Sequence, residues 1–555
     1  IEIIRGPKSL LYGSNTIGGV VNTSLIGSPS KKVDKFSNQF SIGRESFNDG
    51  FYGNAMFYIP IKKNQINLFI SNRNTKNQTS PIKELENTES NTKLYKLGFT
   101  RYNNKGYINF IFENYNISYG IPPSPLATYN ADIDIALWKE TSQINLHQDI
   151  DFYRFNTLDI KFDFINYIHI EMVNNNGDYN NIFELLDVRD YHLGLAKKTY
   201  NYQLELNSDN IIIGTEFNIK EFTPHGLYYT PPTDEQRISF YGFQEKTLQK
   251  VNVDLLASFR LGHLLIKPKA LNNQYNYIDG EMVNTKEFNN ASFSLGIRKN
   301  INKFTINSWM MHAMRPPRVE ELFSDGPHLA TYAYEIGNPK LESERIYGIE
   351  NSINYNDDKF NFSLVTFYNY SPYYYQISKK GYCEGEYIPG YSHPCAGANF
   401  IDWGSGPNGF LFLYDVKGHE AEIKGYEIDL KYQIKNIYLN YNFSLAHGDD
   451  KTLEVPLSYM NPTKQIFSLN YKIKFSDYKI RFSKIHLQDR LGEFETSTSG
   501  TILTDLIINY KYNKHNITLQ FNNIFDEVYY NHLSRIKDLN PEPGASMHLI
   551  YKVIF

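Results

Sequence analysis

Apolar and polar residues alternate along most of the chain, and the clearest example lies near its end. Between residues 505 and 512 every second side chain is apolar, a turn follows at 513–515, and the same alternation continues to residue 522. A period of two places the apolar side chains on one face of an extended strand, because successive side chains point to opposite faces. The pattern therefore predicts an antiparallel pair of strands with one apolar and one polar face.

The same unit recurs from about residue 35 onward. The sequence predicts about 22 strands, near 36–46, 50–61, 65–76, 92–102, 107–117, 140–152, 155–170, 190–206, 210–222, 237–247, 250–260, 289–299, 303–312, 345–355, 359–369, 422–433, 436–446, 466–475, 478–486, 501–512, 516–525 and 546–555. Short turns alternate with longer polar connections, and the number is even, as in closed membrane barrels. No blade-length repeat points to a β-propeller. We predict an all-β fold, one transmembrane antiparallel β-barrel over residues 31–555.

Composition supports a membrane barrel over several soluble domains. Aromatic residues make up 15% of the 555 residues, with 45 Tyr and 37 Phe against 3 Trp. Mean hydropathy is −0.47, and no run of 18 apolar residues could form a transmembrane helix. A barrel reconciles these facts, because only alternate residues of its strands face lipid. The net charge of −4 disfavours a nucleic-acid partner.

The first 22 residues hold the most specific string in the chain. It contains Arg5-Gly6-Pro7, then Tyr12-Gly13, then Gly18-Gly19 ahead of a β-branched pair. Glycine adopts positive φ at little cost, so the string predicts two short strands joined by tight glycine turns. Arg5 is a candidate for an ion pair with a carboxylate of the barrel wall, which would fix the position of this segment more than it would add net stability.

This string resembles the end of the plug domain of TonB-dependent outer-membrane receptors, with a minor departure at Thr16 and Ile17. Residues 315–344 are similar to the mid-barrel loop of those receptors, and within them 325–331 and 334–336 resemble a narrower branch that includes receptors assigned to zinc or other metal uptake. Residues 523–544 resemble the last external loop of the same branch. The aromatic residue Phe555 at the end of an alternating strand resembles the terminal signature by which bacterial outer-membrane proteins are recognised for insertion. The resemblance covers nearly the whole chain.

The resemblance implies a receptor in the cell outer membrane for active uptake of a scarce metal or metal chelate, such as an iron–siderophore, zinc or haem. Residues 1–30 would be the C-terminal part of the plug, lying in the lumen. The TonB energy-coupling complex would act through an N-terminal plug segment absent from this sequence. Lipid and the metal ligand are the other expected partners, and no cofactor is implied. The alternative function is a passive pore or a surface-binding barrel, which would have no plug.

No arrangement typical of an enzyme is found. The sequence contains no Gly-x-Ser-x-Gly, no phosphate-binding glycine loop and no His-Glu-x-x-His. A catalytic function is therefore not predicted.

Histidines and carboxylates in the predicted long loops are the candidate ligand-binding residues. Imidazole and carboxylate together suit zinc and other borderline divalent ions. His328 and His532, in the two branch-like loops, are the predicted metal ligands, and the neighbouring candidates are His393, His447, Glu384 and Asp449. His225 and His419 are also expected in long loops. The alternative for each is a solvated loop residue. The motif residues Glu321, Asn338 and Glu344 are expected to fix loop geometry.

Cys383 and Cys395 are the only two cysteines. They lie twelve residues apart in a segment rich in Gly, Pro and Tyr. A metal site would require cysteines closer together in sequence and further ligands nearby. A disulfide that closes a surface loop in an oxidising compartment fits better.

Overall fold

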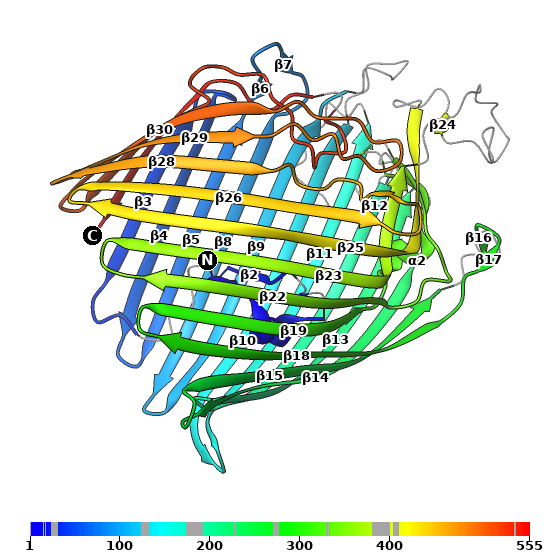
Figure 1. The fold of residues 1–555 in the computed structure, drawn as a ribbon, viewed down its shortest axis with the longest axis horizontal. Helices are drawn as coiled ribbons and strands as arrows, with labels where there is room; N and C mark the ends of the chain where they lie inside the picture. The colour runs from blue at the N-terminus through cyan, green and yellow to red at the C-terminus, as the bar shows by residue number, and fades with distance from the viewer. Residues whose placement is uncertain are drawn as a thin grey trace.

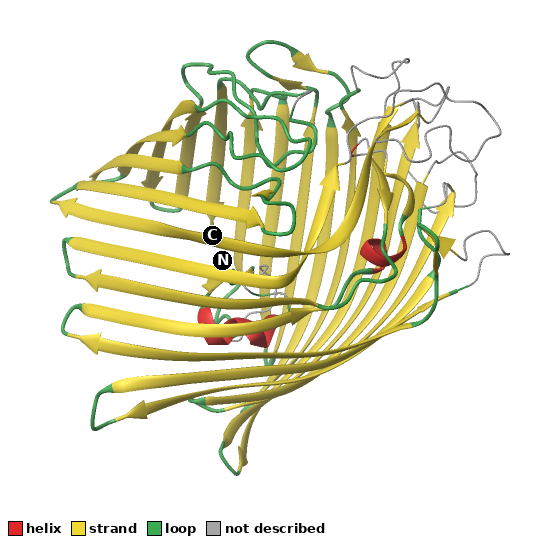
Figure 2. Cartoon of the chain, turned by 45° about the vertical axis from the view of Figure 1, so that its right-hand side comes forward, coloured by secondary structure: helices red, strands yellow, loops and turns green. Residues whose placement is uncertain are grey.

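The computed structural model is a closed antiparallel barrel with a short segment of chain inside it (Figures 1 and 2). It describes residues 2–14, 16, 18–23, 32–123, 133–173, 193–226, 229–269, 277–328, 331, 333–379, 400–402, 410–537 and 540–555. No helix in this part of the chain is long and apolar enough to cross a membrane.

Twenty-two strands form the wall, in sequence order around the barrel. They are β3 (Ser37–Glu45), β4 (Gly50–Ile61), β5 (Asn64–Thr75), β8 (Ser90–Asn103), β9 (Gly106–Ile121), β10 (Ile133–Phe152), β11 (Phe155–Val173), β12 (Leu193–Asn207), β13 (Ile211–Gly226), β14 (Thr233–Leu248), β15 (Val253–Pro268), β18 (Lys286–Ile301), β19 (Phe304–Arg315), β22 (Glu344–Asn356), β23 (Phe360–Lys379), β25 (Phe410–Ile434), β26 (Ile437–Asp450), β28 (Lys464–Ile473), β29 (Ser476–Ile485), β30 (Thr501–Tyr512), β31 (His515–Asn522) and β32 (Ser546–Ile554). The predicted barrel and its strand number are confirmed.

The alternation in the sequence becomes the two faces of the wall. On β18, Phe293 and Leu295 are 49% and 61% exposed on the outer face, while Ser292 and Ser294 are 1% exposed on the inner face. An apolar outer face can contact lipid, whereas the polar inner face lines the lumen. This division explains why a chain of negative mean hydropathy can build a membrane wall.

The last strand closes the barrel on the first. β32 pairs antiparallel with β3, from Gln39 opposite Ile554 to Glu45 opposite His548. The backbone of Phe555 continues the pairing by exchanging hydrogen bonds with Asn38, at 2.9 and 3.2 Å. No strand edge of the barrel is left open, so every strand of the wall has two neighbours.

Short turns lie at one end of the barrel and the longer connections at the other (Figure 1). The longer connections hold small elements of their own, namely β6 (Gln78–Thr79), β7 (Glu84–Leu85), β16 (Tyr277–Ile278), β17 (Glu281–Met282), α2 (Val319–Phe323), β20 (Asp325–His328), β21 (Ala333–Ile336), β24 (Phe400–Asp402) and β27 (Val455–Pro456). The end that carries them is called the loop end below.

Several strands run further toward the loop end than the sequence predicted. β10 begins at Ile133 instead of 140, and β25 begins at Phe410 instead of 422. Beyond the lipid band a strand needs no apolar face, so alternation no longer marks it. The expectation that His225, His419 and His447 lie in loops is therefore wrong, because they lie in β13, β25 and β26.

Residues 2–23 form a hairpin inside the barrel, called the N-terminal hairpin below (Figure 2). β1 (Glu2–Ile4) pairs antiparallel with β2 (Val20–Asn22), as predicted. Between them lies a 3-10 helix, η1 (Gly6–Tyr12), where the sequence predicted only tight turns. Pro7 favours a helical start because its φ is fixed and its missing N–H is not needed there. Gly6 adopts φ +70°, which only glycine does cheaply.

Candidate functional site

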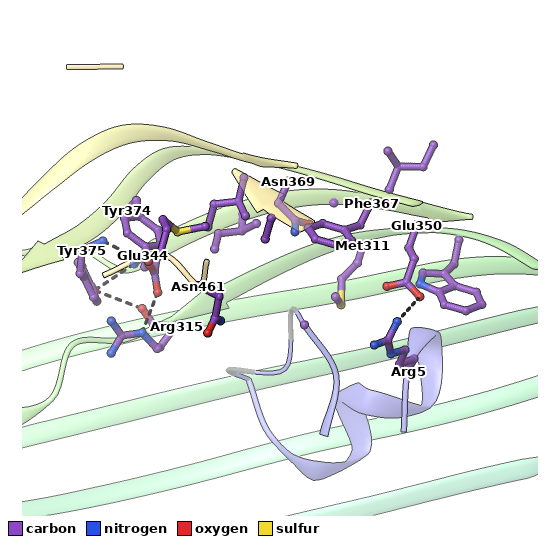
Figure 3. A pocket seen from close by; sticks show the side chains of 18 of the residues that line it. Arg5, Met311, Arg315, Glu344, Glu350, Phe367, Asn369, Tyr374, Tyr375 and Asn461 are labelled. Carbon is purple, nitrogen blue, oxygen red and sulfur yellow. Dashed lines mark hydrogen bonds and ion pairs between the residues drawn. The ribbon is translucent and has the colours of Figure 1, made fainter. Parts of the chain in front are cut away.

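Ion pairs hold the N-terminal hairpin against the barrel wall. The Arg5 guanidinium donates a hydrogen bond of 2.7 Å to Glu427 on β25 and lies 3.9 Å from Glu350 on β22. Figure 3 shows Arg5 pointing from the hairpin toward Glu350. The predicted pairing of Arg5 with a wall carboxylate is confirmed. One guanidinium thus fixes the hairpin to two strands of the wall.

The opposite side of η1 packs on four neighbouring strands. Gly6 lies so close to the Trp309 ring that an added Cβ would stand 3.0 Å from it. The Nζ atom of Lys8 lies 5.0 Å above the Phe243 ring, a cation–π contact. Arg260 donates to the carbonyl oxygens of Leu10 and Leu11, at 3.4 and 3.2 Å. η1 therefore contacts β14, β15, β18 and β19, while the ion pairs of Arg5, just before it, reach β22 and β25.

A cavity of about 540 Å³ lies between the hairpin and the wall, with Arg5 at its edge (Figure 3). We call it the Arg5 cavity. Its far side is formed by Arg315, Glu344 and Tyr375, from β19, β22 and β23. The carboxylate of Glu350 also faces it. Its lining mixes these charged groups with apolar and aromatic side chains.

Arg315 organises the connection between β19 and β22, which we call the mid-barrel loop (residues 316–343). Its guanidinium donates to Glu344 at 2.7 Å and to both carboxylate oxygens of Glu321 at 2.9 and 3.0 Å. Glu321 also accepts from the backbone N–H of Arg318 at the start of α2. The side-chain oxygen of Asn338 accepts a hydrogen bond of 2.9 Å from the backbone N–H of Lys340 and so fixes the turn that follows. The structural roles expected for Glu321, Asn338 and Glu344 are confirmed.

Helix α2 is buried between the loop end and the lumen. Its apolar residues Val319, Leu322 and Phe323 are at most 3% exposed and pack in one cluster with residues of β13, β15, β18, β23 and β25. A five-residue helix cannot persist alone in water, so this packing must hold it in place. The mid-barrel loop is thereby folded inward against the wall.

A second cavity, of about 650 Å³, lies under the mid-barrel loop and touches the N-terminal hairpin at Ser14. We call it the Glu335 cavity. Six cationic side chains line it: Lys197, Lys220, Arg237, Arg315, Arg318 and Arg535. Four of them form ion pairs with carboxylates that also line the cavity. Five carboxylates line the same cavity, so its six cations leave an excess of one positive charge, and within the described residues no carboxylate forms an ion pair with Arg237 or Arg318.

Three side chains from separate segments converge on the Glu335 carboxylate. The Tyr229 hydroxyl donates to its Oε2 atom at 2.7 Å, and Arg535 donates to Oε1 at 2.8 Å. The His328 Nδ1 atom lies 3.4 Å from the same Oε1 atom. On its other side, His328 Nε2 lies 3.6 Å from Glu171 at the end of β11. His328 therefore stands between two carboxylates.

These contacts set the charges of His328 and Glu335, which lie in the mid-barrel loop, outside the membrane-spanning strands. Burial by itself would lower the pKa of His328, but its hydrogen bond to Glu335 and the charges of Glu171 and Glu335 outweigh burial and raise that pKa. Burial also favours the neutral form of Glu335, yet its contacts with His328 and Arg535 lower its pKa to about 2. Glu335 is thus an anion, and His328 binds a proton more readily than a free imidazole.

The other predicted metal ligand, His532, is buried in a different cluster. Its Nδ1 atom lies 2.8 Å from the Thr498 hydroxyl and its Nε2 atom 2.9 Å from Glu495. Lys537 donates to the hydroxyls of Thr496 and Thr498 at 2.7 and 3.2 Å. Residues 532–537, called the strap below, are in this way pinned at both ends to the connection between β29 and β30.

The predicted ligands do not form one site among the described residues. His328 lines the Glu335 cavity, whereas His532 lines another cavity of about 620 Å³. Asp449, on β26, accepts a hydrogen bond of 2.5 Å from Arg490, and His447 lies two residues before it. No group of three or more His, Cys, Asp or Glu side chains is placed to hold a metal ion in this part of the chain.

The remaining candidates fall outside the described residues. His393, Glu384, Cys383 and Cys395 all lie in 380–399. The predicted disulfide and the predicted ligand role of His393 and Glu384 stay predictions.

Sequence reasoning named Glu335 as an acidic neighbour of the loop histidines but missed the other partners of His328 and Glu335. Arg535 and Lys537 belong to the string that resembles the last external loop, so that string was the available signal. Tyr229 and Glu171 stand in no motif, and their role depends on strand pairing and on how the loops fold inward. Only the three-dimensional structure brings them to Glu335.

Protonation of His328 should tighten the loop end in mild acid. Because the pKa of His328 is raised, its attraction to Glu171 and Glu335 is fully present below pH 6.5 and is lost as the pH rises through that raised pKa. Tyr229 stays neutral, since burial raises its pKa well above 10, and Arg535 stays charged. A cysteine introduced at Ser14, on the floor of the cavity, should react faster with an external thiol reagent at pH 8.5 than at pH 6.

The intrinsic pH dependence of the thiol is removed by reference to a second variant. The rate is divided by that of a Ser14→Cys chain carrying His328→Gln, which has no proton to lose there. We expect the ratio to rise at least about twofold between pH 6 and pH 8.5. A ratio that does not change with pH would show that His328 does not hold the loops.

The chain matches the family model described as TonB dependent receptor-like, beta-barrel, over residues 37–524. Its fold is similar to that of the copper transporter OprC, with a TM-score of 0.80 at 14% identity over 100% of this chain and 85% of that chain. It is also similar to the FrpB iron transporter from Neisseria meningitidis (F3-3 variant), with a TM-score of 0.68 at 13% identity over 94% and 82%.

A further similar structure is the siderophore receptor PirA from Pseudomonas aeruginosa, with a TM-score of 0.66 at 13% identity over 100% of this chain and 86% of that chain. At such identities these likenesses show the fold alone.

Proposed function

We propose that this chain, which belongs to the TonB-dependent receptor β-barrel family, takes up a metal chelate across the outer membrane. Members of this family are outer-membrane transporters and receptors rather than enzymes. Capture of a scarce ligand outside the cell must be coupled to energy, since binding alone cannot concentrate it. The energy source would be the TonB complex, acting on plug residues that precede the N-terminal hairpin.

The observation that supports this proposal most is that the N-terminal hairpin is bound to the inner wall of the barrel. A wide barrel leaves a lumen that needs a plug, and residues 2–23 bind the wall through Arg5, Lys8 and the carbonyls that Arg260 holds. We assign residues 1–30 to the end of a plug domain and residues 31–555 to the barrel. A passive pore would not need a segment of chain bound inside its lumen.

A chelate suits the Glu335 cavity better than a bare divalent cation does. The cavity volume of about 650 Å³ is in the range of small-molecule sites. Arg237 and Arg318 give it an excess of positive charge, which would repel a free cation and attract an anionic chelate. It lies between the hairpin and the mid-barrel loop, where a ligand arriving from the loop end would meet the plug.

Residues that the sequence predicted as ligands would take part in binding the chelate. His328 is placed to touch a ligand in the cavity, while His532 would act by positioning the strap. His393 and Glu384 would contribute from their loop, and His447 and Asp449 from the loop end of β26. A Cys383–Cys395 disulfide would restrict the conformations of the segment that carries His393 and Glu384.

Elemental analysis of starved cells tests the proposal. Cells with and without the intact gene are grown in media depleted of iron, zinc or copper, each then supplied as its citrate chelate, and the metal content is measured. We expect one metal to accumulate at least about fivefold more in cells with the gene. Equal contents for all three metals would contradict uptake of a metal chelate.

A further inference from the structure

We propose that Tyr229, His328 and Arg535 form a binding site for a carboxylate group of the transported chelate, and that Glu335 occupies this site in the ligand-free protein. We call these three residues the cradle. The inference rests on the proposed function only in naming the chelate as the source of the carboxylate.

The cradle is built to hold a planar group with two oxygen atoms. Tyr229 donates to one oxygen of Glu335, while Arg535 and His328 contact the other, at 2.7, 2.8 and 3.4 Å. Hydrogen bonds of this kind, with a charged donor or acceptor, are about twice as strong as neutral ones. The three donors come from the β13–β14 connection, β20 and the strap, so only the folded loop end assembles them.

The donors are fixed in place before any ligand arrives. Arg535 lies in the strap, which His532 and Lys537 pin on either side, and its guanidinium stacks 4.7 Å above the Tyr414 ring. Tyr229 is only 4% exposed. Preorganised donors lose little conformational freedom on binding and so favour a ligand anion.

Glu335 can leave the cradle because it lies on the small hairpin of β20 and β21, inside the mid-barrel loop. Its side chain is 20% exposed and lines the Glu335 cavity together with all three donors. A ligand in that cavity therefore meets the cradle directly. Removal of the Glu335 charge would leave Arg535 and a protonatable His328 facing the cavity, which favours another anion in its place.

Arg237 and Arg318 give the same cavity further positive charge, so an incoming anion is attracted before it reaches the cradle. When a carboxylate of the ligand replaces Glu335, the tie between the strap and the mid-barrel loop breaks. Binding in the cavity is thereby linked to movement of the loop end.

Chemical rescue tests this inference with acetate as the probe. The Glu335→Ala variant of the full chain has an empty cradle, whereas Glu335→Gln keeps it filled with a neutral group of the same shape. We expect ¹³C-acetate to bind purified Glu335→Ala at least about tenfold more tightly than the wild-type chain, Glu335→Gln or Glu335→Ala/Arg535→Ala.

A second readout follows the loops in intact cells through the rate at which a cysteine at Ser14 is labelled. Glu335→Ala should label at least about fivefold faster than the parent, and 100 mM acetate, but not chloride of equal ionic strength, should restore a slow rate. Glu342→Ala is the matched control, since Glu342 lies in the same loop and forms an exposed ion pair with Arg345 on β22. It should change neither the rate nor the response to acetate.

Equal acetate binding by Glu335→Ala and Glu335→Ala/Arg535→Ala would overturn the inference, as would the absence of binding by a folded Glu335→Ala chain. Neither readout involves uptake. A failure of the cradle is therefore distinguishable from a failure of the proposed transport, which the metal contents of starved cells decide.

Discussion

Replacement of Arg315 by methionine should release the mid-barrel loop while the barrel stays folded. Arg315 joins Glu321 and Glu344, and the three side chains are 13%, 11% and 6% exposed. Removal of one partner from a buried ion pair costs about 3–5 kcal/mol, because the remaining carboxylates are left without a counter-charge. Trypsin added to intact cells should then cut the loop after Arg318 or Lys340 at least about tenfold faster.

An exposed ion pair in the same region supplies the control. Arg345 pairs with Glu342 at 3.2 Å, and their side chains are 39% and 68% exposed. Because such pairs contribute about 0–1 kcal/mol, Arg345→Met should change the cleavage rate little. Heat-dependent mobility on a denaturing gel would report whether each barrel is folded. A folded Arg315→Met chain that is cut as slowly as the parent would refute the role assigned to Arg315.

Charge reversal at Arg5 should unseat the N-terminal hairpin. Arg5→Glu would bring a third carboxylate toward Glu427 and Glu350, which now lie 2.7 and 3.9 Å from the guanidinium. Attraction then becomes repulsion beside a partly buried cavity. We expect cells to become at least about fourfold more sensitive to a hydrophilic antibiotic that is too large for general pores.

The exchanged pair separates a specific contact from a general loss of folding. Arg5→Glu/Glu427→Arg restores opposite charges at the same two positions and should recover most of the barrier. If Arg5→Glu alone leaves antibiotic sensitivity unchanged, or if the exchange does not improve it, the ion pair does not seat the hairpin.

The barrel could be predicted from sequence because its wall is a repeated two-residue pattern. β4 and β30 have the predicted bounds, since their alternation runs through the whole lipid-facing length. β25 begins twelve residues earlier than predicted, because the alternation was not recognised in its loop-end part. η1 was missed for another reason: the glycines mark turns, but the packing of Leu10 against Met311 and Ala313 depends on the wall.

The candidate site was predicted less completely, since its contacts join residues far apart in the chain. Arg535 and Glu335 are 200 residues apart and share one hydrogen bond. Residue type and loop position led to His328, His532 and the acidic neighbour Glu335, but not to their other partners. A motif identifies residues on one segment, whereas the cradle needs three segments folded over one cavity. The wall pairing of Arg5 was predictable because a charged residue in a segment placed inside the lumen faces the polar inner wall.

Energy-dependent accumulation is the most direct test of the central claim, uptake through a plugged barrel driven by the TonB complex. Cells that express the intact gene are given the metal chelate that accumulates in the starvation experiment, and cell-associated metal is followed before and after the proton-motive force is collapsed, and in cells without TonB. We predict accumulation above the external concentration that falls at least about tenfold under both treatments. Entry that only equalises the two concentrations, and continues unchanged without TonB, would contradict the account and favour a passive pore.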